Sequence, residues 1–400
     1  MSRLWEKGDS INDTVLRFSV GNDHLLDERL VKHDVRGSIA HARMLCSIGA
    51  LSDEDCETLC AGLQEIGESH ARGEWHIAME EEDCHTAIEN RLVEATGEAG
   101  ERVHLGRSRN DQVMTALRLY LLEVEERLEE AVGGLVVALS GVRERQGNLA
   151  LPGYTHMQRA MPSSVALWVG GFEAEFEDDI EGLRASRRRM DKNPLGSAAG
   201  YGVPVFELDR EHTARALGFS VVQEPVTAVQ LSRGKAEAGL LFEISLLMQD
   251  VGRLAAELCL FASAEFGFVQ LPAAFTTGSS IMPQKRNPDV FELLRGRAAR
   301  AHTDLVEVLS LTAKMPSGYH RDLQLIKPPL FGGIDSTLEC LEVAALAVEN
   351  ITFLEEPLQR AMDESLRATE RAYTRVQSEG IPFRQAYREV AAEQAPPKKK

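Results

Sequence analysis

The sequence predicts an all-α fold, because proline is scarce and the apolar residues recur with helical spacing. The first proline is Pro152, and none occurs between Pro225 and Pro272, so two long intervals lack the residue that breaks helices. Both intervals are rich in Leu, Ala, Glu and Arg, which favour helix. Only 203–206 and 219–222 have a pattern typical of strands. We therefore expect long helices and very little sheet.

The longest predicted helix covers residues 111 to 145. At about 1.5 Å per residue it would approach about 50 Å, too long for a compact shell of one chain to cover. It must pack lengthwise on other long helices, which predicts a bundle. Its apolar side chains recur every three or four residues on one face, at Val113, Leu117, Leu121, Val124, Leu128, Val132, Leu135, Val136 and Leu139.

Three further segments share this periodicity, 163–190, 228–266 and 289–311, and segments with Pro or Gly flank each of them. Turn-prone or charged residues interrupt the helical pattern near Val103 and again at 351–356. We expect three domains, which are a helical N-terminal domain over 1–104, the long-helix bundle over 105–352, and a short C-terminal domain with a solvated basic tail over 353–400.

The charge balance limits the partners of the protein. Acidic residues number 62 against 44 basic ones, and the net charge of −18 repels nucleic acid and anionic membranes. Apolar runs fall short of the roughly 20 residues that cross a bilayer. We expect neither partner. An anionic substrate would need a local basic pocket, for which the candidates are Arg107, Arg109, Lys285, Arg321 and Lys327.

The six cysteines are scattered without a CxxC pair, and the N-terminal segment MSRLWEKGD lacks the apolar stretch of a signal peptide. A cytoplasmic location is therefore expected. No dinucleotide fingerprint or P-loop occurs, so we expect no nucleotide cofactor. Cys56 and Cys60 lie four residues apart, but two sulfurs without a nearby histidine make a weak metal site, and we expect no metal.

The segment from Gly278 to Pro288, GSSIMPQKRNP, combines two hydroxyls, a cation and an amide. Removing a proton next to a carboxylate places a second negative charge on that carboxylate, so the reaction needs a base together with preorganised cationic and NH donors. Ser279 or Ser280, Lys285 and Asn287 offer these groups. A structural alternative is that Asn287 and the proline after it simply open a helix.

This segment resembles the signature of the fumarase/aspartase superfamily, whose members release fumarate from succinyl-bearing substrates, and its PQKRNP form is most similar to the argininosuccinate lyases. Four other segments resemble that family in the same order along the chain: VRGSIAHARML (35–45), GRSRNDQVMTALRLY (106–120), GYTHMQRAMP (153–162) and YHRDLQLIK (319–327). The resemblance implies elimination of fumarate from argininosuccinate to give arginine, without a cofactor. It also implies small helical domains at both ends of a central bundle, and a homotetramer in which three subunits build each active site.

The same resemblance implies catalytic roles. Ser279 would be the base, and backbone NH groups together with Lys285 would stabilise its alkoxide. Lys285 and Asn287 would hold the carboxylate of the doubly charged intermediate. His156 would act as general acid with Glu292 as its acidic partner, since a nearby carboxylate raises the basicity of an imidazole. Taken alone, His156 and Glu292 could also be ordinary polar residues.

Further residues would bind the substrate. Arg109 and Asn110 open the longest helix, where free NH groups bind anions, although the polar residues of this segment could equally cap the helix. Asp83, His85 and Glu89 resemble a helical motif of the family; His85 and Glu89 could bind a metal in principle, but we expect them to support the site by hydrogen bonds. The implied substrate-binding residues are Arg109, Asn110, Thr155, Asn287, Tyr319, Gln324 and Lys327.

Two segments depart from the family pattern. Residues 224–236, EPVTAVQLSRGKA, lack the family's acidic pair, for which Gln230, Arg233 or Lys235 could substitute. The segment after Phe18 lacks the usual Ala-Ser-Ile, so its substrate contact is open. The alternatives are therefore a related fumarate-releasing lyase that acts on a modified argininosuccinate or another succinyl substrate, and a non-catalytic structural homologue.

Overall fold

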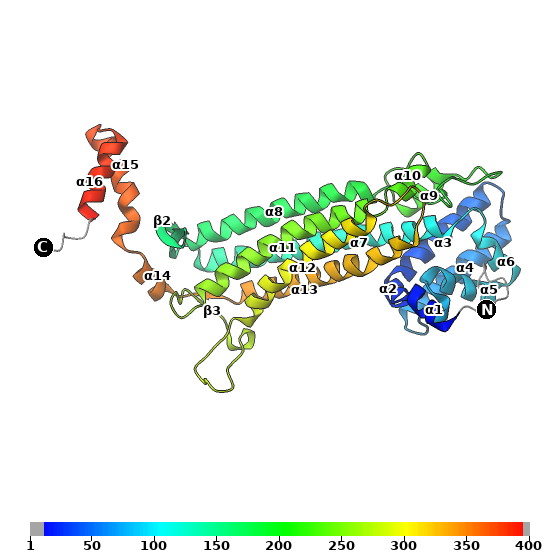
Figure 1. The fold of residues 1–400 in the computed structure, drawn as a ribbon, viewed down its shortest axis with the longest axis horizontal. Helices are drawn as coiled ribbons and strands as arrows, with labels where there is room; N and C mark the ends of the chain where they lie inside the picture. The colour runs from blue at the N-terminus through cyan, green and yellow to red at the C-terminus, as the bar shows by residue number, and fades with distance from the viewer. Residues whose placement is uncertain (1–11, 395–400) are drawn as a thin grey trace. The chain divides into compact units, whose positions relative to one another are not determined.

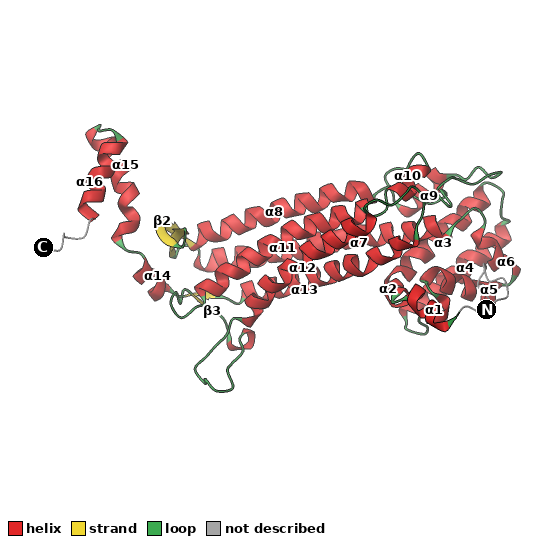
Figure 2. Cartoon of the chain, viewed as in Figure 1, coloured by secondary structure: helices red, strands yellow, loops and turns green. Residues whose placement is uncertain are grey.

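The structure, a computed structural model, describes residues 12–394 and is almost entirely helical (Figures 1 and 2). The all-α fold class is confirmed. No helix in the described part of the chain is both long enough and apolar enough to span a membrane. The N-terminal segment without an apolar stretch and the basic C-terminal tail, both noted in the sequence, lie outside the described residues.

The chain forms two compact units, and each is assembled from three separate stretches of sequence. Unit 1 comprises 1–129, 181–246 and 300–338, and unit 2 comprises 130–180, 247–299 and 339–400. The division into domains at 104 and 352 stays a prediction.

Five long helices contribute to both units, and within each unit they lie side by side (Figure 1). The helix predicted over 111–145 is confirmed, and all of its predicted apolar residues are buried except Val136, which is half-buried. α13 is absent from the predicted helices because Pro328 and Pro329 stand at its start, where a first turn tolerates proline. The five are α7 (Arg109–Gln146), α8 (Val165–Met190), α11 (Lys235–Phe261), α12 (Asp289–Thr312) and α13 (Lys327–Glu349).

The short helices of unit 1 begin at side-chain caps. Ser52 Oγ accepts from the backbone NH of Asp55 at 3.1 Å, and Asp83 Oδ1 accepts from that of Thr86 at 2.7 Å. Leucines from several of these helices are fully buried between them. The elements are α1 (Asp13–Val20), α2 (Asp23–Leu26), η1 (Asp27–Leu30), α3 (Val31–Ser47), α4 (Asp53–Ala71), η2 (Met79–Glu81), α5 (Cys84–Thr96), α6 (Glu98–Glu101), η3 (Arg102–His104), α9 (Arg210–Leu217), α10 (Thr227–Leu231) and η5 (Arg321–Ile326).

The single helix predicted over 228–266 is wrong. α10 ends at Leu231, residues 232–234 form a break, and α11 begins at Lys235 and ends at Phe261. Gly234 has φ +81°, a conformation that side-chain-bearing residues rarely adopt, and a Cβ there would meet Thr312 Cγ2 at 2.3 Å. Close contact with a distant segment therefore fixes the break, and no local pattern reveals it.

The strands predicted at 203–206 and 219–222 are also wrong; of the eight residues, only Val222 pairs, in an isolated bridge with Asn193. In unit 2, β1 (Ala150–Thr155) and β2 (Gln158–Ser164) instead form an antiparallel hairpin in which Pro152 lies opposite Pro162. The prolines of these strands argue against a strand in the sequence. A two-stranded ribbon nevertheless tolerates proline, because each of its strands has a free edge where no NH donor is needed.

The remaining elements belong to unit 2. β3 (Val269–Gln270) pairs with β4 (Thr352–Phe353). Near the C-terminus, two antiparallel helices enclose a small core of Ala372, Ala386 and Val390. These elements are η4 (Ala273–Phe275), α14 (Glu355–Ala361), η6 (Glu364–Arg367), α15 (Ala368–Glu379) and α16 (Phe383–Gln394).

Replacing Gly234 by alanine tests the origin of the helix break. The left-handed backbone and the contact with Thr312 should together destabilise the protein by about 2 kcal/mol or more. Gly134→Ala is the matched control: Gly134 lies inside α7 with open space around it, and alanine there should be neutral or stabilising by about 0.5–1 kcal/mol. Urea unfolding of both variants measures the difference, and equal stability would contradict this explanation of the break.

Candidate active site

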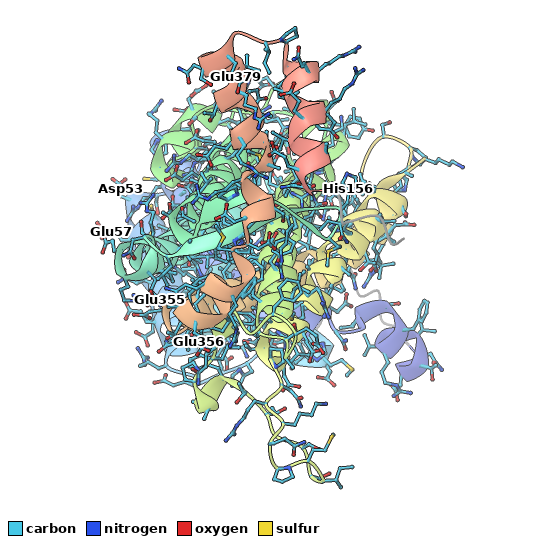
Figure 3. All side chains as sticks on the ribbon, turned by 90° about the vertical axis from the view of Figure 1, so that its left-hand side faces the viewer. Asp53, Glu57, His156, Glu355, Glu356 and Glu379 are labelled. Atoms are coloured by element: carbon cyan, nitrogen blue, oxygen red, sulfur yellow. The ribbon has the colours of Figure 1, made fainter. Side chains whose placement is uncertain are left out.

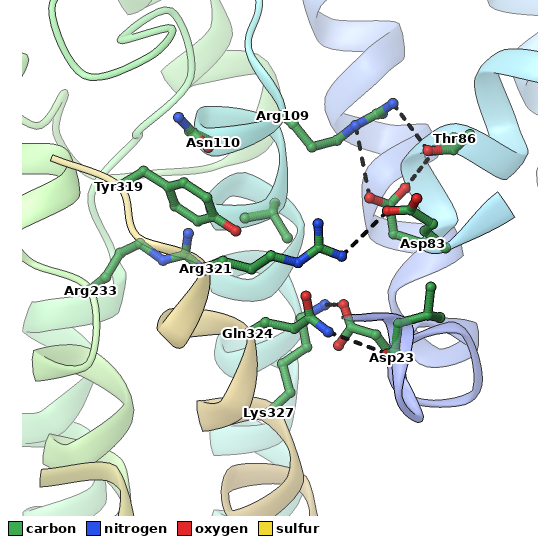
Figure 4. Close-up of a pocket in the computed structure, with 13 residues that line it drawn as sticks. Asp23, Asp83, Thr86, Arg109, Asn110, Arg233, Tyr319, Arg321, Gln324 and Lys327 are labelled. Carbon is green, nitrogen blue, oxygen red and sulfur yellow. Dashed lines mark hydrogen bonds and ion pairs between the residues drawn. The ribbon is translucent and has the colours of Figure 1, made fainter. Parts of the chain in front are cut away.

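Unit 1 contains a pocket of about 240 Å³ in which charged side chains converge (Figure 4). Residues far apart in the sequence line it, from the end of α1, the starts of α2, α5, α7 and α13, the break before α11, and η5. Five of the sequence-predicted substrate-binding residues lie in its wall: Arg109, Asn110, Tyr319, Gln324 and Lys327.

Lys327, at the start of α13, lies at the base of this pocket, where only 3% of its surface is exposed. Its Nζ donates to Asp27 Oδ1 at 2.6 Å and to Asp23 Oδ2 at 2.9 Å. Burial alone would lower the pKa of Lys327, but the two carboxylates raise it above its ordinary value. Burial raises the pKa of Asp23, and the neighbouring Asp27 adds to this. Lys327 is therefore a buried cation held by two carboxylates.

Arg109 lies on the opposite wall of the pocket, at the start of α7. Its Nη2 donates to Thr86 Oγ1 at 3.2 Å, and its Nε lies 3.9 Å from Asp83 Oδ2. Glu89 adds a carboxylate oxygen 3.5 Å from Nη2. Burial acts against ionisation of Asp83, yet Arg109 and His85 hold the pKa of Asp83 below its usual value. The guanidinium is thus oriented by groups of α5.

His85 supports this wall from behind. Its Nδ1 lies 3.1 Å from Asp34 Oδ1, and both side chains are buried. Burial would lower the pKa of His85, but Asp34 raises it. Asp27, Cys84 and His85 offer ligand atoms within 4.8 Å of one another. However, Asp27 already binds the ammonium of Lys327, and burial raises the pKa of the Cys84 thiol. Asp27 therefore serves as a partner of Lys327, and we do not assign a metal site to Asp27, Cys84 and His85.

η5 ties the pocket to the end of α1. Gln324 Nε2 donates to the carbonyls of Ser19 at 3.0 Å and of Val20 at 3.3 Å. Arg321 Nη2 donates to Ser19 at 3.1 Å and lies 3.4 Å from Glu82 Oε2. The N-terminal segment whose contact the sequence left open therefore reaches the pocket and contributes Asp23 to its wall.

Of the basic residues proposed for an anion pocket, Arg109, Arg321 and Lys327 line this one. Arg107 is instead buried and donates to Ser38 Oγ at 2.7 Å. Lys285 belongs to an exposed loop of unit 2. Arg233 lines the pocket as well, with its guanidinium 5.2 Å from the centre of the Tyr319 ring.

The four predicted catalytic residues all belong to unit 2. Thr155 ends β1, and His156, which is labelled in Figure 3, forms with Met157 the two-residue turn of the hairpin. Both turn residues have positive φ, +53° and +60°, which glycine or asparagine would normally supply. Backbone strain of this kind is concentrated at functional sites. The turn presents the side chain of His156 to solvent.

The signature segment is an exposed loop between η4 and α12, closed at its base by backbone hydrogen bonds between Thr277 and Asn287. Ser279 Oγ accepts from the backbone NH groups of Ile281 at 3.3 Å and Met282 at 3.2 Å. Two NH donors at one hydroxyl would stabilise its alkoxide. The loop therefore already orients donors toward Ser279.

Ser279 is half-buried, whereas the other two predicted catalytic residues are exposed. Lys285 lies in the signature loop, and Glu292 lies in the first turns of α12. Within residues 12–394, His156 and Glu292 form no hydrogen bond or ion pair with each other. The unit 2 residues are thus displayed on the surface, whereas the unit 1 residues already enclose a pocket.

Comparisons with known proteins place the chain in a family. The lyase family matches residues 15–302. The chain is 45% identical to the argininosuccinate lyase of Sorangium cellulosum over 98% of this chain and 90% of that protein. It is 41% identical to that of Thermotoga neapolitana over 97% of both chains.

Solved structures agree on the fold. EDDS lyase in complex with formate matches with a TM-score of 0.80, 24% identity, and coverage of 96% of this chain and 76% of that one. The class II fumarase of Schistosoma mansoni matches with a TM-score of 0.79, 18% identity, and coverage of 94% and 91%. The chain therefore belongs to the lyase family of the fumarase/aspartase superfamily, and within it to the argininosuccinate lyases.

Proposed function

We propose that this protein cleaves argininosuccinate into arginine and fumarate, the closing reaction of arginine biosynthesis. One observation supports this function most directly: five of the seven residues that the resemblance assigns to substrate binding meet in one pocket of unit 1, although they come from positions 109 to 327. That pocket offers both signs of charge, as a substrate with carboxylate, ammonium and guanidinium groups requires.

In the proposed mechanism, the Ser279 alkoxide takes a proton from the succinyl carbon next to a carboxylate. The electron pair moves into that carboxylate, and Lys285 and Asn287 stabilise the resulting double negative charge. The pair then forms the carbon–carbon double bond of fumarate as the bond to the guanidine nitrogen breaks. His156, assisted by Glu292, donates the proton that the departing arginine needs. The chain supplies every acid and base in this sequence.

A homotetramer with shared active sites is part of the same proposal. Large apolar side chains are exposed on the long helices, and contact between copies of the chain would remove them from water. In unit 1 they include Phe242, Leu246, Val306 and Leu309, and in unit 2 Val137, Leu167, Leu293 and Leu346. Neighbouring copies would cover these surfaces and bring the exposed unit 2 residues to a pocket. We place this assembly in the cytoplasm, where thiols such as Cys46 and Cys60 stay reduced.

The substrate is tested by following fumarate release with four compounds in parallel. Argininosuccinate should give rapid release, whereas adenylosuccinate, aspartate and malate should give little, because they lack an arginine end. Release from one of the other three at a comparable rate, or none from argininosuccinate, would overturn the assignment.

The base is tested with two neighbouring serines. Ser279→Ala should reduce fumarate release by about 10³-fold or more, since the group that removes the proton is lost. Ser280→Ala is the matched control and should lose far less activity. Circular dichroism and size-exclusion chromatography would show that both variants keep their fold and assembly. Equal losses in the two variants would contradict the role of Ser279.

The sharing of sites is tested by mixing two inactive variants, Ser279→Ala and Arg109→Met. If each site takes Ser279 from one subunit and Arg109 from another, some sites in the mixed tetramer carry neither defect. Co-refolded mixtures should then regain a measurable fraction of wild-type activity. If one subunit supplied both residues, every site would keep one defect, and no activity would return.

A further inference from the structure

Arg233 stands out among the four cations of the unit 1 pocket because, within residues 12–394, no carboxylate forms an ion pair with it, although Glu237 and Asp23 lie near enough to act on it electrostatically. Lys327 is held by Asp23 and Asp27, and Arg321 by Glu82. Arg109 faces Asp83 and Glu89. By contrast, Arg233 Nε and Nη1 are buried without any hydrogen-bond partner among the described residues. No dashed line reaches Arg233 in Figure 4.

An unpaired buried charge is costly, so its position requires an explanation. Only 6% of the Arg233 surface is exposed, and burial lowers the pKa of Arg233. Its contact with the Tyr319 ring compensates only part of the hydration free energy that the guanidinium loses on burial. Losing the hydration of an ion usually costs several kcal/mol. An anion bound in the pocket could supply the hydrogen-bond acceptors that the Arg233 guanidinium lacks.

The backbone holds Arg233 firmly in this place. The residue lies in the break between α10 and α11, next to Gly234 with its left-handed conformation. Arg118 donates to Ser232 Oγ at 2.8 Å and to the carbonyl of Lys192 at 2.5 Å, which anchors the same turn. The break therefore directs the guanidinium into the pocket.

We propose that Arg233 binds the α-carboxylate of the arginine end of the substrate, and this inference rests on the proposed function. The wall of the pocket also carries the carboxylates of Asp23, Glu82 and Asp83. Each of these carboxylates is paired with a cation of the pocket, which leaves Arg233 for a carboxylate of the substrate, and their oxygens can still accept hydrogen bonds from the ammonium of an amino-acid zwitterion. The planar fork of an arginine matches a carboxylate in two parallel hydrogen bonds. Tyr319, beside Arg233, belongs to the group that the resemblance assigns to substrate binding.

The test compares two ligands that differ only at this carboxylate, L-arginine and L-argininamide, together with fumarate. Their affinities are measured by calorimetry for the wild-type protein, Arg233→Met and Arg233→Lys. Arg233→Met should bind arginine about 10- to 100-fold more weakly, as expected when a charge-assisted hydrogen bond is lost. Its affinity for argininamide and fumarate should change by no more than about twofold. Arg233→Lys keeps the charge but not the planar fork, so its affinity for arginine should lie between those of the wild-type protein and Arg233→Met.

A second measurement separates ligand binding from a structural role. Replacing an unpaired buried charge by methionine should leave the melting temperature unchanged or raise it, whereas losing a structural contact would lower it. Arg43→Met, on the exposed face of α3, is the matched control and should change neither the melting temperature nor any of the three affinities.

Three outcomes would overturn this role of Arg233: equal losses for arginine and argininamide, a loss confined to fumarate, or no arginine binding by a wild-type protein that releases fumarate. A different result would refute the proposed reaction and leave the role of Arg233 intact. In that case the wild-type protein releases no fumarate, but Arg233→Met still weakens the binding of arginine and not that of argininamide.

Discussion

The structure of unit 1 depends on the burial of one cation, Lys327, between two carboxylates. An ammonium with 3% exposure cannot remain charged without close acceptors, and Asp23 and Asp27 supply them from the first helices of the chain. This ion pair joins the start of α13 to the N-terminal segment, and η5 reinforces the junction through Gln324. Removing one partner would leave a buried charge uncompensated, so the junction and the pocket above it depend on each other.

In the proposed mechanism, the two units carry different groups of site residues. Unit 1 contains a pocket lined by charged side chains. Carboxylates of the protein already neutralise its cations, except Arg233. Unit 2 carries His156 and Ser279, which we propose to be catalytic, on a turn and a loop, where His156 has a positive φ and two backbone NH groups donate to Ser279. Exposed loops can bring side chains to a substrate that another part of the assembly holds. The exposed apolar side chains of the long helices favour assembly with further copies of the chain.

The sequence predicts well the features that depend on local pattern. The apolar periodicity of α7 places its ends within two residues of those observed, and the family-like segments 106–120 and 319–327 contain five predicted residues that meet in the pocket. It misses features that tertiary contacts create. The break at Gly234 depends on Thr312, and the importance of Asp23 and Arg233 comes from burial and from the presence or absence of a partner. The sequence marks Arg233 only as one of several polar residues in a divergent segment.

The most direct test of this account is a crystal structure of the Ser279→Ala variant with argininosuccinate bound, because loss of the base should preserve the intact substrate. The arginine end should lie in the unit 1 pocket, with its α-carboxylate against Arg233 and its ammonium toward the carboxylates around Asp23. The succinyl end should contact Lys285 and Asn287. A substrate bound in the opposite orientation, or an empty unit 1 pocket in a crystal with the substrate bound elsewhere, would contradict it.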